Sequence, residues 1–353
     1  MLDSLHRRPR GRRLAPALSG LTGGRVPAAT AADADRRLEA LRRYRAPEYA
    51  ERLGPPSQAL LARLDAADVA EVRRRVEPAL EGFWERSGAV TQEHLKLILG
   101  VHYRVESVLA KTGLRHDEPP EDVHAMARGA LAAGGDPWIA DLLAGAAERG
   151  GRELTAGARV LDFGCSSGRH LRVLQAWRPE VGWAGCDPNR RAIEWASAQL
   201  PGIEFFVSPQ EPPLELAPDS LDVAFAVSVW SHFAAGAAER WLAELHRLLR
   251  PGGLLILTVQ GFASVAHYLR AAAISPEAAA SAVEDLLATG RHDLDAFGPG
   301  GDWGVASPEW GMAYMTLEWL AARATPAWAL ALYEPARLDS NQDLVVLERA
   351  GGR

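Results

Sequence analysis

RVLDFGCSSGRH, residues 159–170, decides the fold. An apolar run from Val160 to Phe163 is followed by a turn of small residues and then by residues that begin a helix. In doubly wound α/β sheets such a turn directs the N-terminus of the helix at a ligand, and its small residues let the backbone approach that ligand. The charges around the turn then indicate which ligand is bound.

Those charges exclude the two commonest ligands of such turns. A dinucleotide site has the spacing G-x-G-x-x-G, whereas Gly164 and Gly168 lie four residues apart with Ser166 between them. A phosphate-binding loop needs Gly-Lys-Ser/Thr, which is absent from the sequence. The strand also ends in Asp162, whose carboxylate repels a pyrophosphate but suits a cationic ligand.

A second acid, Asp187, ends the next apolar run, 25 residues beyond Asp162. A carboxylate at this place can accept hydrogen bonds from both hydroxyls of a ribose. Together the two acids indicate a nucleoside that has no pyrophosphate and carries a positively charged tail.

Strands and helices alternate from Ala158 onward, and the strands show little polar alternation. This pattern is typical of a parallel sheet covered by helices on both faces, and it predicts an α/β, Rossmann-like doubly wound fold. We also expect a helix from Pro308. The expected strands are residues 158–164, 181–187, 203–208, 220–229, 254–261, 328–334 and 342–349.

The residues before this region predict helices and no strand. One helix is expected to start at Thr91 and to run about five turns, and another to start at Asp136, a cap residue followed by proline. The Arg-rich N-terminus resembles a transit peptide or a nucleic-acid-binding arm, but the unpatterned sequence that follows favours a disordered leader. The expected organisation is a leader over 1–32, a helical N-terminal cap over 33–135, and a catalytic domain over 136–353 with a substrate insert at about 262–307.

The composition restricts the partners of the protein. The chain has 353 residues and a net charge of −6, which does not favour nucleic acid or an anionic membrane as a partner. No stretch approaches the ~20 apolar residues of a membrane span. With two cysteines, Cys165 and Cys186, a disulfide framework is not expected, which favours a reducing, cytoplasmic setting. The oligomeric state stays open.

Four motifs in order, VLDFGCSSG, GCDPN, SLDVAFAVSVWSHF and LLRPGGLLILT, resemble those of the class I S-adenosylmethionine-dependent methyltransferases. The resemblance covers residues 136 to 349, and the closing segments are similar to a bacterial small-molecule branch of the family. It implies a seven-stranded, mostly parallel sheet with the last strand antiparallel, and S-adenosylmethionine as the cofactor. The cofactor-binding residues implied are Asp162, Gly164, Cys165, Ser166, Gly168, Asp187, Pro188, Gln210 and Ser228.

The chain departs from the family pattern at two positions. Ser166 stands where the family has the middle glycine of the turn, and Ser208 stands where the family has an acid that holds the adenine amine. Pro209, which follows, has no N–H to offer the adenine. We expect the side-chain amide of Gln210 to replace both contacts.

His232, in the motif SVWSHF after the fourth strand, is the candidate general base because ligands bind at the carboxyl edge of such sheets. A structural role in holding its loop is the alternative. Arg169 begins a helix, where a cation is unfavourable, so a bound carboxylate is one interpretation and a side chain that reaches into solvent is the other. Trp230, Trp303 and Trp310 are further candidates for acceptor contacts, with core packing as their alternative. No spacing of His94 and His102 with Cys or carboxylates predicts a metal site.

The sequence therefore predicts an enzyme that transfers a methyl group from S-adenosylmethionine to a small molecule, on oxygen rather than nitrogen or carbon. Two alternatives stay open. One is a catalytically inactive S-adenosylmethionine-binding partner or regulatory protein, which the unusual Ser208-Pro209 pair allows. The other is an aminopropyl-transferring enzyme on the same fold, for which the acids near Asp293 give faint support.

Overall fold

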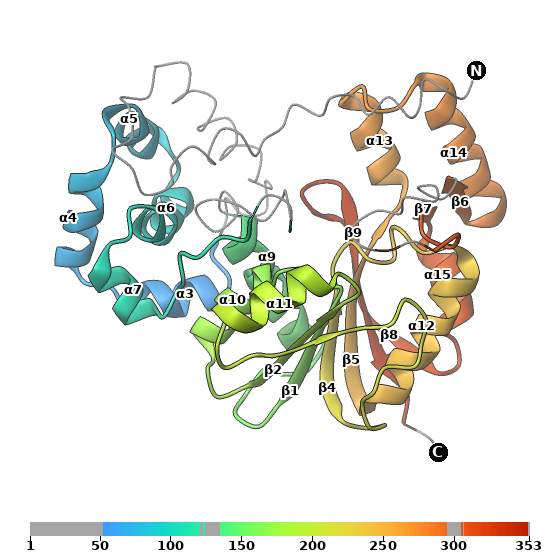
Figure 1. The fold of residues 1–353 in the computed structure, drawn as a ribbon. Coiled ribbons are helices and arrows are strands. Elements are labelled where there is room, and N and C mark those ends of the chain that lie inside the picture. The colour runs from blue at the N-terminus through green and yellow to red at the C-terminus, as the bar shows by residue number, and fades with distance from the viewer. Residues whose placement is uncertain (1–51, 121–122, 124–134, 295–304, 306, 352–353) are drawn as a thin grey trace.

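The computed structural model describes residues 52–120, 123, 135–294, 305 and 307–351. The predicted leader, residues 33–51 of the predicted helical cap, and Trp303 lie outside these residues. At the centre of the molecule is a twisted sheet with helices on both faces (Figure 1). Its strands are β1 Arg159–Phe163, β2 Gly182–Asp187, β3 Glu204–Val207, β4 Leu221–Ala226, β5 Leu249–Gln260, β6 Arg291–Leu294, β7 Met312–Met315, β8 Trp328–Leu338 and β9 Gln342–Arg349.

The sheet confirms the predicted Rossmann-like fold. Strands β3, β2, β1, β4 and β5 lie side by side in that order and are all parallel. The last strand, β9, pairs antiparallel with β5 and with β8, which completes the seven expected strands. Two short strands were not expected: β6 and β7 form an antiparallel pair that joins β5 through the single register pair Gln260 and Tyr314.

Alternate residues of the central strands point into two separate cores, as the period of two in a strand requires. Val160 and Val346 face one side, with helices α9 Gly135–Arg149, α10 Arg169–Trp177 and α11 Arg190–Gln199. Leu161 and Val345 face the other side, with α12 Ala235–Leu248 and α15 Leu317–Ala324. A parallel sheet buried on both faces has apolar residues on both, which explains the missing polar alternation in the sequence.

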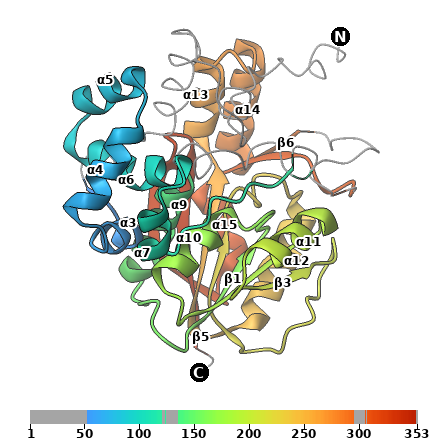
Figure 2. The ribbon, with the colours of Figure 1, turned by 60° about the vertical axis from the view of Figure 1, so that its left-hand side comes forward.

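Short helices ahead of α9 stand beside α9 and α10 (Figure 2). Four of them share a core of their own, in which Val72, Trp84 and Leu95 are buried. Helix α3 instead buries Leu60 in the core of the sheet. These helices are α3 Pro55–Leu61, α4 Ala66–Arg75, α5 Pro78–Arg86, α6 Ala89–His102 and α7 Glu106–Thr112.

The helix expected from Thr91 is two helices, α6 and α7. The chain turns at Arg104, which has φ +49°, and the N–H of Val105 donates to the carbonyl of Gly100. A side chain at Gly100 would lie 2.7 Å from Val108, so the missing Cβ allows the two helices to pack closely. Neither proline nor glycine occurs at the turn itself, which is why the sequence did not predict the break.

The segment after β5 forms two further helices, α13 Phe262–Arg270 and α14 Pro276–Thr289, which project beyond the sheet (Figure 1). The helix expected from Pro308 was placed too early: β7 comes first, and α15 begins at Leu317 after the side chain of Thr316 caps it. Of the predicted insert, residues 262–294, 305 and 307 are described, and its boundaries stay a prediction.

Helix α3 is capped by a residue far along the chain. The carboxylate of Asp141, on α9, accepts hydrogen bonds from the backbone N–H groups of Gly54, at 2.9 Å, and Ser57, at 2.8 Å. Asp141 is 4% exposed, and a Cβ on Gly54 would lie 2.4 Å from it. The contact therefore holds the N-terminal helices on the sheet domain.

We predict that Asp141→Ala lowers the free energy of unfolding by about 2–3 kcal/mol, because one buried and one partly buried N–H group lose a charged acceptor. Urea denaturation followed by circular dichroism measures the loss. The matched control is Asp65→Ala, which removes the exposed cap of α4 and is expected to cost about 1 kcal/mol. Equal losses in the two variants would contradict a special role for Asp141.

Candidate active site

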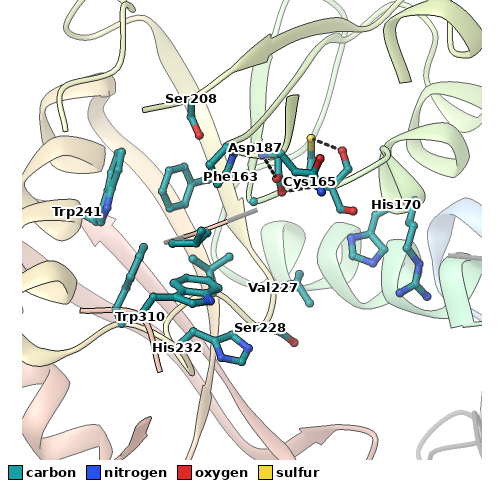
Figure 3. A pocket seen from close by; sticks show the side chains of 18 of the residues that line it. Phe163, Cys165, His170, Asp187, Ser208, Val227, Ser228, His232, Trp241 and Trp310 are labelled. Atoms are coloured by element: carbon teal, nitrogen blue, oxygen red, sulfur yellow. Dashed lines mark hydrogen bonds between the residues drawn. The ribbon is translucent and has the colours of Figure 1, made fainter. Parts of the chain in front are cut away.

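A cavity of about 380 Å³ opens at the carboxyl ends of the parallel strands (Figure 3). Its described walls come from the turn after β1, the end of β2, the segment after β3, the loop after β4, and helices α9 and α12. Residues just before β7 and the turn between β8 and β9 complete it. This is the edge at which ligands bind in doubly wound sheets.

The turn after β1 needs glycine at two places. Gly164 has φ +80° and Gly168 has φ +74°, a conformation that favours glycine. A Cβ would lie 2.5 Å from Val229 at Gly164 and 2.8 Å from Phe205 at Gly168. Ser166 adopts φ +50°, so the serine that replaces the family glycine keeps the left-handed backbone.

The two acids predicted from the sequence lie next to this turn. Asp162 is 1% exposed, and its Oδ2 has no hydrogen-bond donor among the described residues. The closest ionisable partner is Nδ1 of His170, at 3.7 Å. A buried negative charge just behind the turn favours a positively charged group in the cavity, which fits a site for a cationic ligand.

Asp187 is held by backbone N–H groups on both oxygens. Oδ2 accepts from Ser166 at 2.8 Å, and Oδ1 accepts from Asn189 at 2.8 Å. Burial raises the pKa of Asp187 to about 6, against the two hydrogen bonds, which lower it. The carboxylate therefore lines the cavity in an environment that opposes its charge.

The loop after β4 brings Ser228 and His232 to the cavity. Ser228 has φ +59°, and its N–H donates to Oγ1 of Thr258 at 2.8 Å. His232 Nδ1 lies 2.8 Å from the carbonyl oxygen of Gly311. A carbonyl can only accept, so Nδ1 carries the proton and the lone pair of the neutral ring is on Nε2.

The segment before β7 holds this loop. The N–H of Gly311 donates to the carbonyl of His232, and the N–H of Ala234 donates to the carbonyl of Glu309, both at 2.8 Å. Phe233 and Trp310 form an antiparallel bridge. The ring of His232 is therefore fixed from its backbone and from Nδ1.

Arg169 does bind a carboxylate, and this carboxylate belongs to the protein itself. Arg169 Nε donates to Oδ1 of Asp136 at 2.8 Å, and Arg172 binds the other oxygen. Asp136 lies in α9 and is fully buried. Burial raises the pKa of its carboxyl group, but the positive charges of the two arginines hold this pKa below its ordinary value. Asp136 thus acts as the counter-ion of two arginines, and α9 begins one residue before it.

The structure brings most of the predicted site residues together. Three lie behind the wall rather than in it: Asp162, Gly168 and Trp230, of which Trp230 is 0% exposed and packs on Phe233. Trp303 lies outside the described residues. Those that line the cavity are Gly164, Cys165, Ser166, Arg169, Asp187, Pro188, Gln210, Ser228, His232 and Trp310.

Several wall residues were not predicted from the sequence. Trp241 sits in an amphipathic helix, where a residue of the core and a residue of a cavity wall have the same spacing. Phe163 and Phe233 gave no signal beyond their apolar character, and Leu338 and Gln342 come from a turn more than 100 residues from the loop they join.

The described residues include no cluster of three or more His, Cys, Asp or Glu suited to a metal ion. Within the same residues, no helix is long and apolar enough to cross a membrane.

Residues 160–253 match the family model for a methyltransferase domain. A curated phthiotriol/phenolphthiotriol dimycocerosates methyltransferase from Mycobacterium ulcerans is 33% identical over 108 residues, which cover 29% of this chain and 38% of the relative. Trans-aconitate 2-methyltransferase from Methylobacterium nodulans has the same identity over the same shares. The chain thus spans about two fifths of the length of the curated relatives it matches.

Among solved structures, an S-adenosylmethionine-dependent methyltransferase from Mesorhizobium loti is similar at a TM-score of 0.39 and 19% identity, over 58% of this chain and 96% of that one. The family match over residues 160–253, which hold the glycine turn and the two acids, shows a methyltransferase domain and supports the resemblance to the class I S-adenosylmethionine-dependent methyltransferases. S-adenosylmethionine is the cosubstrate of this class, and the glycine turn and the carboxylate of Asp187, which line the cavity, fit it.

Asp187→Asn is predicted to stabilise the free protein and to weaken S-adenosylmethionine binding. A carboxyl group whose pKa is higher in the folded state than in the unfolded state stabilises the fold only while it is protonated. The stabilisation by protonated Asp187 is therefore fully present below pH 3.8 and is lost as the pH rises through about 6. The neutral amide avoids the loss, but its NH2 group cannot accept from one of the two backbone N–H groups, so we expect a net gain of about 1 kcal/mol at pH 7.5.

The affinity of the wild-type protein for S-adenosylmethionine should likewise fall as the pH is lowered through about 6, because protonation removes acceptor capacity from Asp187. Thermal unfolding and calorimetric titration between pH 5 and 8 measure the two effects. A less stable variant at pH 7.5, or a wild-type affinity that does not change with pH, would contradict this role of Asp187.

Proposed function

We propose that the protein transfers the methyl group of S-adenosylmethionine to a hydroxyl group of a small molecule, with His232 as the general base. The observation that carries the proposal is the position of His232. Its ring lies at the wall of the cavity, and its tautomer is set by the carbonyl of Gly311. Both curated relatives are named for small-molecule acceptors, which supports the same class of acceptor here.

Each part of the cosubstrate has a candidate partner. Asp187 would accept from the ribose hydroxyls, and the buried carboxylate of Asp162, just behind the turn, would favour the positive charge of the methionine end. The adenine would meet Pro188 and the side-chain amide of Gln210. The N–H of Ser208 is already bonded to the carbonyl of Asp187 at 3.1 Å, so the backbone there is not available to the ring.

The reaction needs alignment more than activation. The cosubstrate supplies a methyl group on a positively charged sulfur, which leaves as a neutral thioether. The acceptor oxygen forms a bond to the methyl carbon as the carbon–sulfur bond breaks, and the hydroxyl proton passes to Nε2 of His232. Alignment of two bound reactants supplies up to ~7–11 kcal/mol, and a general base adds ~10²–10⁴ in rate.

The helices before α9 have a place in this proposal as a cap. Helix α3 packs on α9 and α10, and Trp138 and Ile139 of α9 line the cavity. Residues 33–135 would thus close the methionine end. The two free, buried cysteines fit a reducing compartment and support a cytoplasmic location.

His232→Ala is predicted to lower kcat by ~10²–10⁴ and to leave the dissociation constant of S-adenosylmethionine unchanged, because the base acts only on the acceptor. Release of S-adenosylhomocysteine in the presence of an accepted hydroxyl compound measures kcat. His246→Ala, which removes a histidine that lies against Trp328 and does not line the cavity, is the matched control.

An equal kcat in His232→Ala and the wild type would assign His232 a role in holding its loop. Tight binding of S-adenosylmethionine, with no methyl transfer to any hydroxyl compound, would instead favour the non-catalytic alternative.

A further inference from the structure

The parts of the cavity follow the order of the strands. Strands β1, β2 and β3 are neighbours in the sheet, and residues at or just after the carboxyl end of each line the cavity. Figure 3 shows Asp187, at the end of β2, between His170 and Ser208. In the proposed function the methionine part lies at the turn after β1 and the ribose at Asp187. The base of the nucleoside then extends towards the end of β3.

Ser208 is the residue that follows β3, and it lines the cavity with 6% of its surface exposed. Its backbone N–H donates to the carbonyl of Asp187, at 3.1 Å, which extends the parallel pairing of β2 and β3. Pro209, which also lines the cavity, has no N–H. The backbone at these two positions therefore has no N–H to offer to the edge of a base.

The segment that begins at Ser208 is held by helix α12. The carboxylate of Glu244 accepts from the N–H of Leu214 at 2.8 Å, and the guanidinium of Arg247 donates to the carbonyl of Leu216 at 3.0 Å. The segment is thus bonded to β2 at its start and to α12 further along. Ser208 therefore has a fixed place at the cavity before any ligand binds.

The side chain of Ser208 presents a hydroxyl at this place. None of the hydrogen bonds that the structure describes uses this hydroxyl. A hydroxyl both donates and accepts, so it can accept from an amino group at position 6 of a purine and can equally donate to an oxo group there. A carboxylate can only accept, so it would distinguish these two groups.

From these observations we propose that the hydroxyl of Ser208 contacts position 6 of the purine, and that the site does not distinguish a 6-amino from a 6-oxo purine. The side-chain amide of Gln210, which the proposed function also places at the base, likewise has both a donor and an acceptor. The site therefore takes S-inosyl compounds as well as S-adenosyl compounds. This inference rests on the proposed function, because that function places the ribose at Asp187.

Two ligands that differ at position 6 and in the proton on the neighbouring N1 test the proposal. S-adenosylhomocysteine has an amino group at position 6, and S-inosylhomocysteine has an oxo group. Each is titrated by calorimetry into the full-length protein. We expect the two dissociation constants to agree within about threefold, because one hydroxyl makes a hydrogen bond of similar strength with either group.

Two variants of Ser208 change the contact in different ways. Ser208→Asp puts a group that only accepts at the same place, so we expect a preference for S-adenosylhomocysteine of about thirtyfold, which corresponds to about 2 kcal/mol. Ser208→Ala removes the hydroxyl, so we expect both ligands to bind about three- to tenfold more weakly, with their ratio unchanged.

Asn189→Asp is the matched control, because it adds the same charge to a residue of the same cavity wall. The side chain of Asn189 accepts from the N–H of Ala192 at 3.2 Å and caps α11, a bond that aspartate keeps. The added carboxylate is thus directed at the helix and not at the base. This variant should keep the two dissociation constants within about threefold of each other.

The outcomes separate this inference from the proposed function. Failure of S-adenosylhomocysteine to bind the wild type would overturn the proposed function itself. If S-adenosylhomocysteine binds, then a wild-type preference of more than about threefold for either ligand, or unchanged binding of both ligands to Ser208→Ala, would overturn the inference. Equal affinities of Ser208→Asp for the two ligands would also overturn it. The wild type and Ser208→Ala keep the test decisive if Ser208→Asp does not fold.

Discussion

The end of β2 is the point on which the site depends. The carbonyl of Cys186 accepts from the N–H groups of Gly164 and Cys165, at 2.9 and 3.0 Å, and the carboxylate of Asp187 accepts from Ser166. The carbonyl of Asp187 in turn accepts from Ser208. Two residues of one strand thus hold the turn after β1 and the segment after β3. These bonds fix the shape of the cosubstrate end of the cavity before any ligand binds.

The acceptor end depends on a different constraint, which the chain supplies more than 70 residues later. The segment before β7 binds the loop after β4 through backbone hydrogen bonds and through the bridge between Phe233 and Trp310. Arg291 adds a bond from its guanidinium to the carbonyl of Phe233, at 2.5 Å, and lies 4.4 Å over the ring of Trp319. The β6–β7 pair is therefore what positions His232 against the cavity. In the proposed function, the sheet thus provides the cosubstrate end of the cavity, and the segment that ends in β7 provides the acceptor end.

The central sheet could be predicted from the sequence because each strand and turn is a local pattern. The same holds for Asp162, Asp187 and His232, since acids at the ends of parallel strands and the loop after β4 must meet at one edge. What escaped prediction depends on contacts between distant segments. The pairing of Asp136 with Arg169 and Arg172, for example, joins α9 to α10, and Asp136 alone has the sequence signature of a cap.

Two further features, the break between α6 and α7 and the short strand β7, could not be predicted for a related reason. Packing against Val108 turns the chain at Arg104, where the local sequence favours a continuing helix. The residues of β7 are apolar and few, so periodicity cannot separate them from the start of a helix. Trp241 and Trp310 show the same limit, because spacing along the chain cannot distinguish a tryptophan of the core from one that lines a cavity.

The central claim is that the two strand-end acids select a nucleoside with a positively charged tail over a dinucleotide. The most direct test is calorimetric titration of the full-length protein at pH 7.5 with S-adenosylmethionine, S-adenosylhomocysteine and NAD in parallel. The account predicts that S-adenosylmethionine and S-adenosylhomocysteine each bind at one site per chain, and that NAD does not bind. Binding of NAD, or failure of both S-adenosyl compounds to bind, would contradict it.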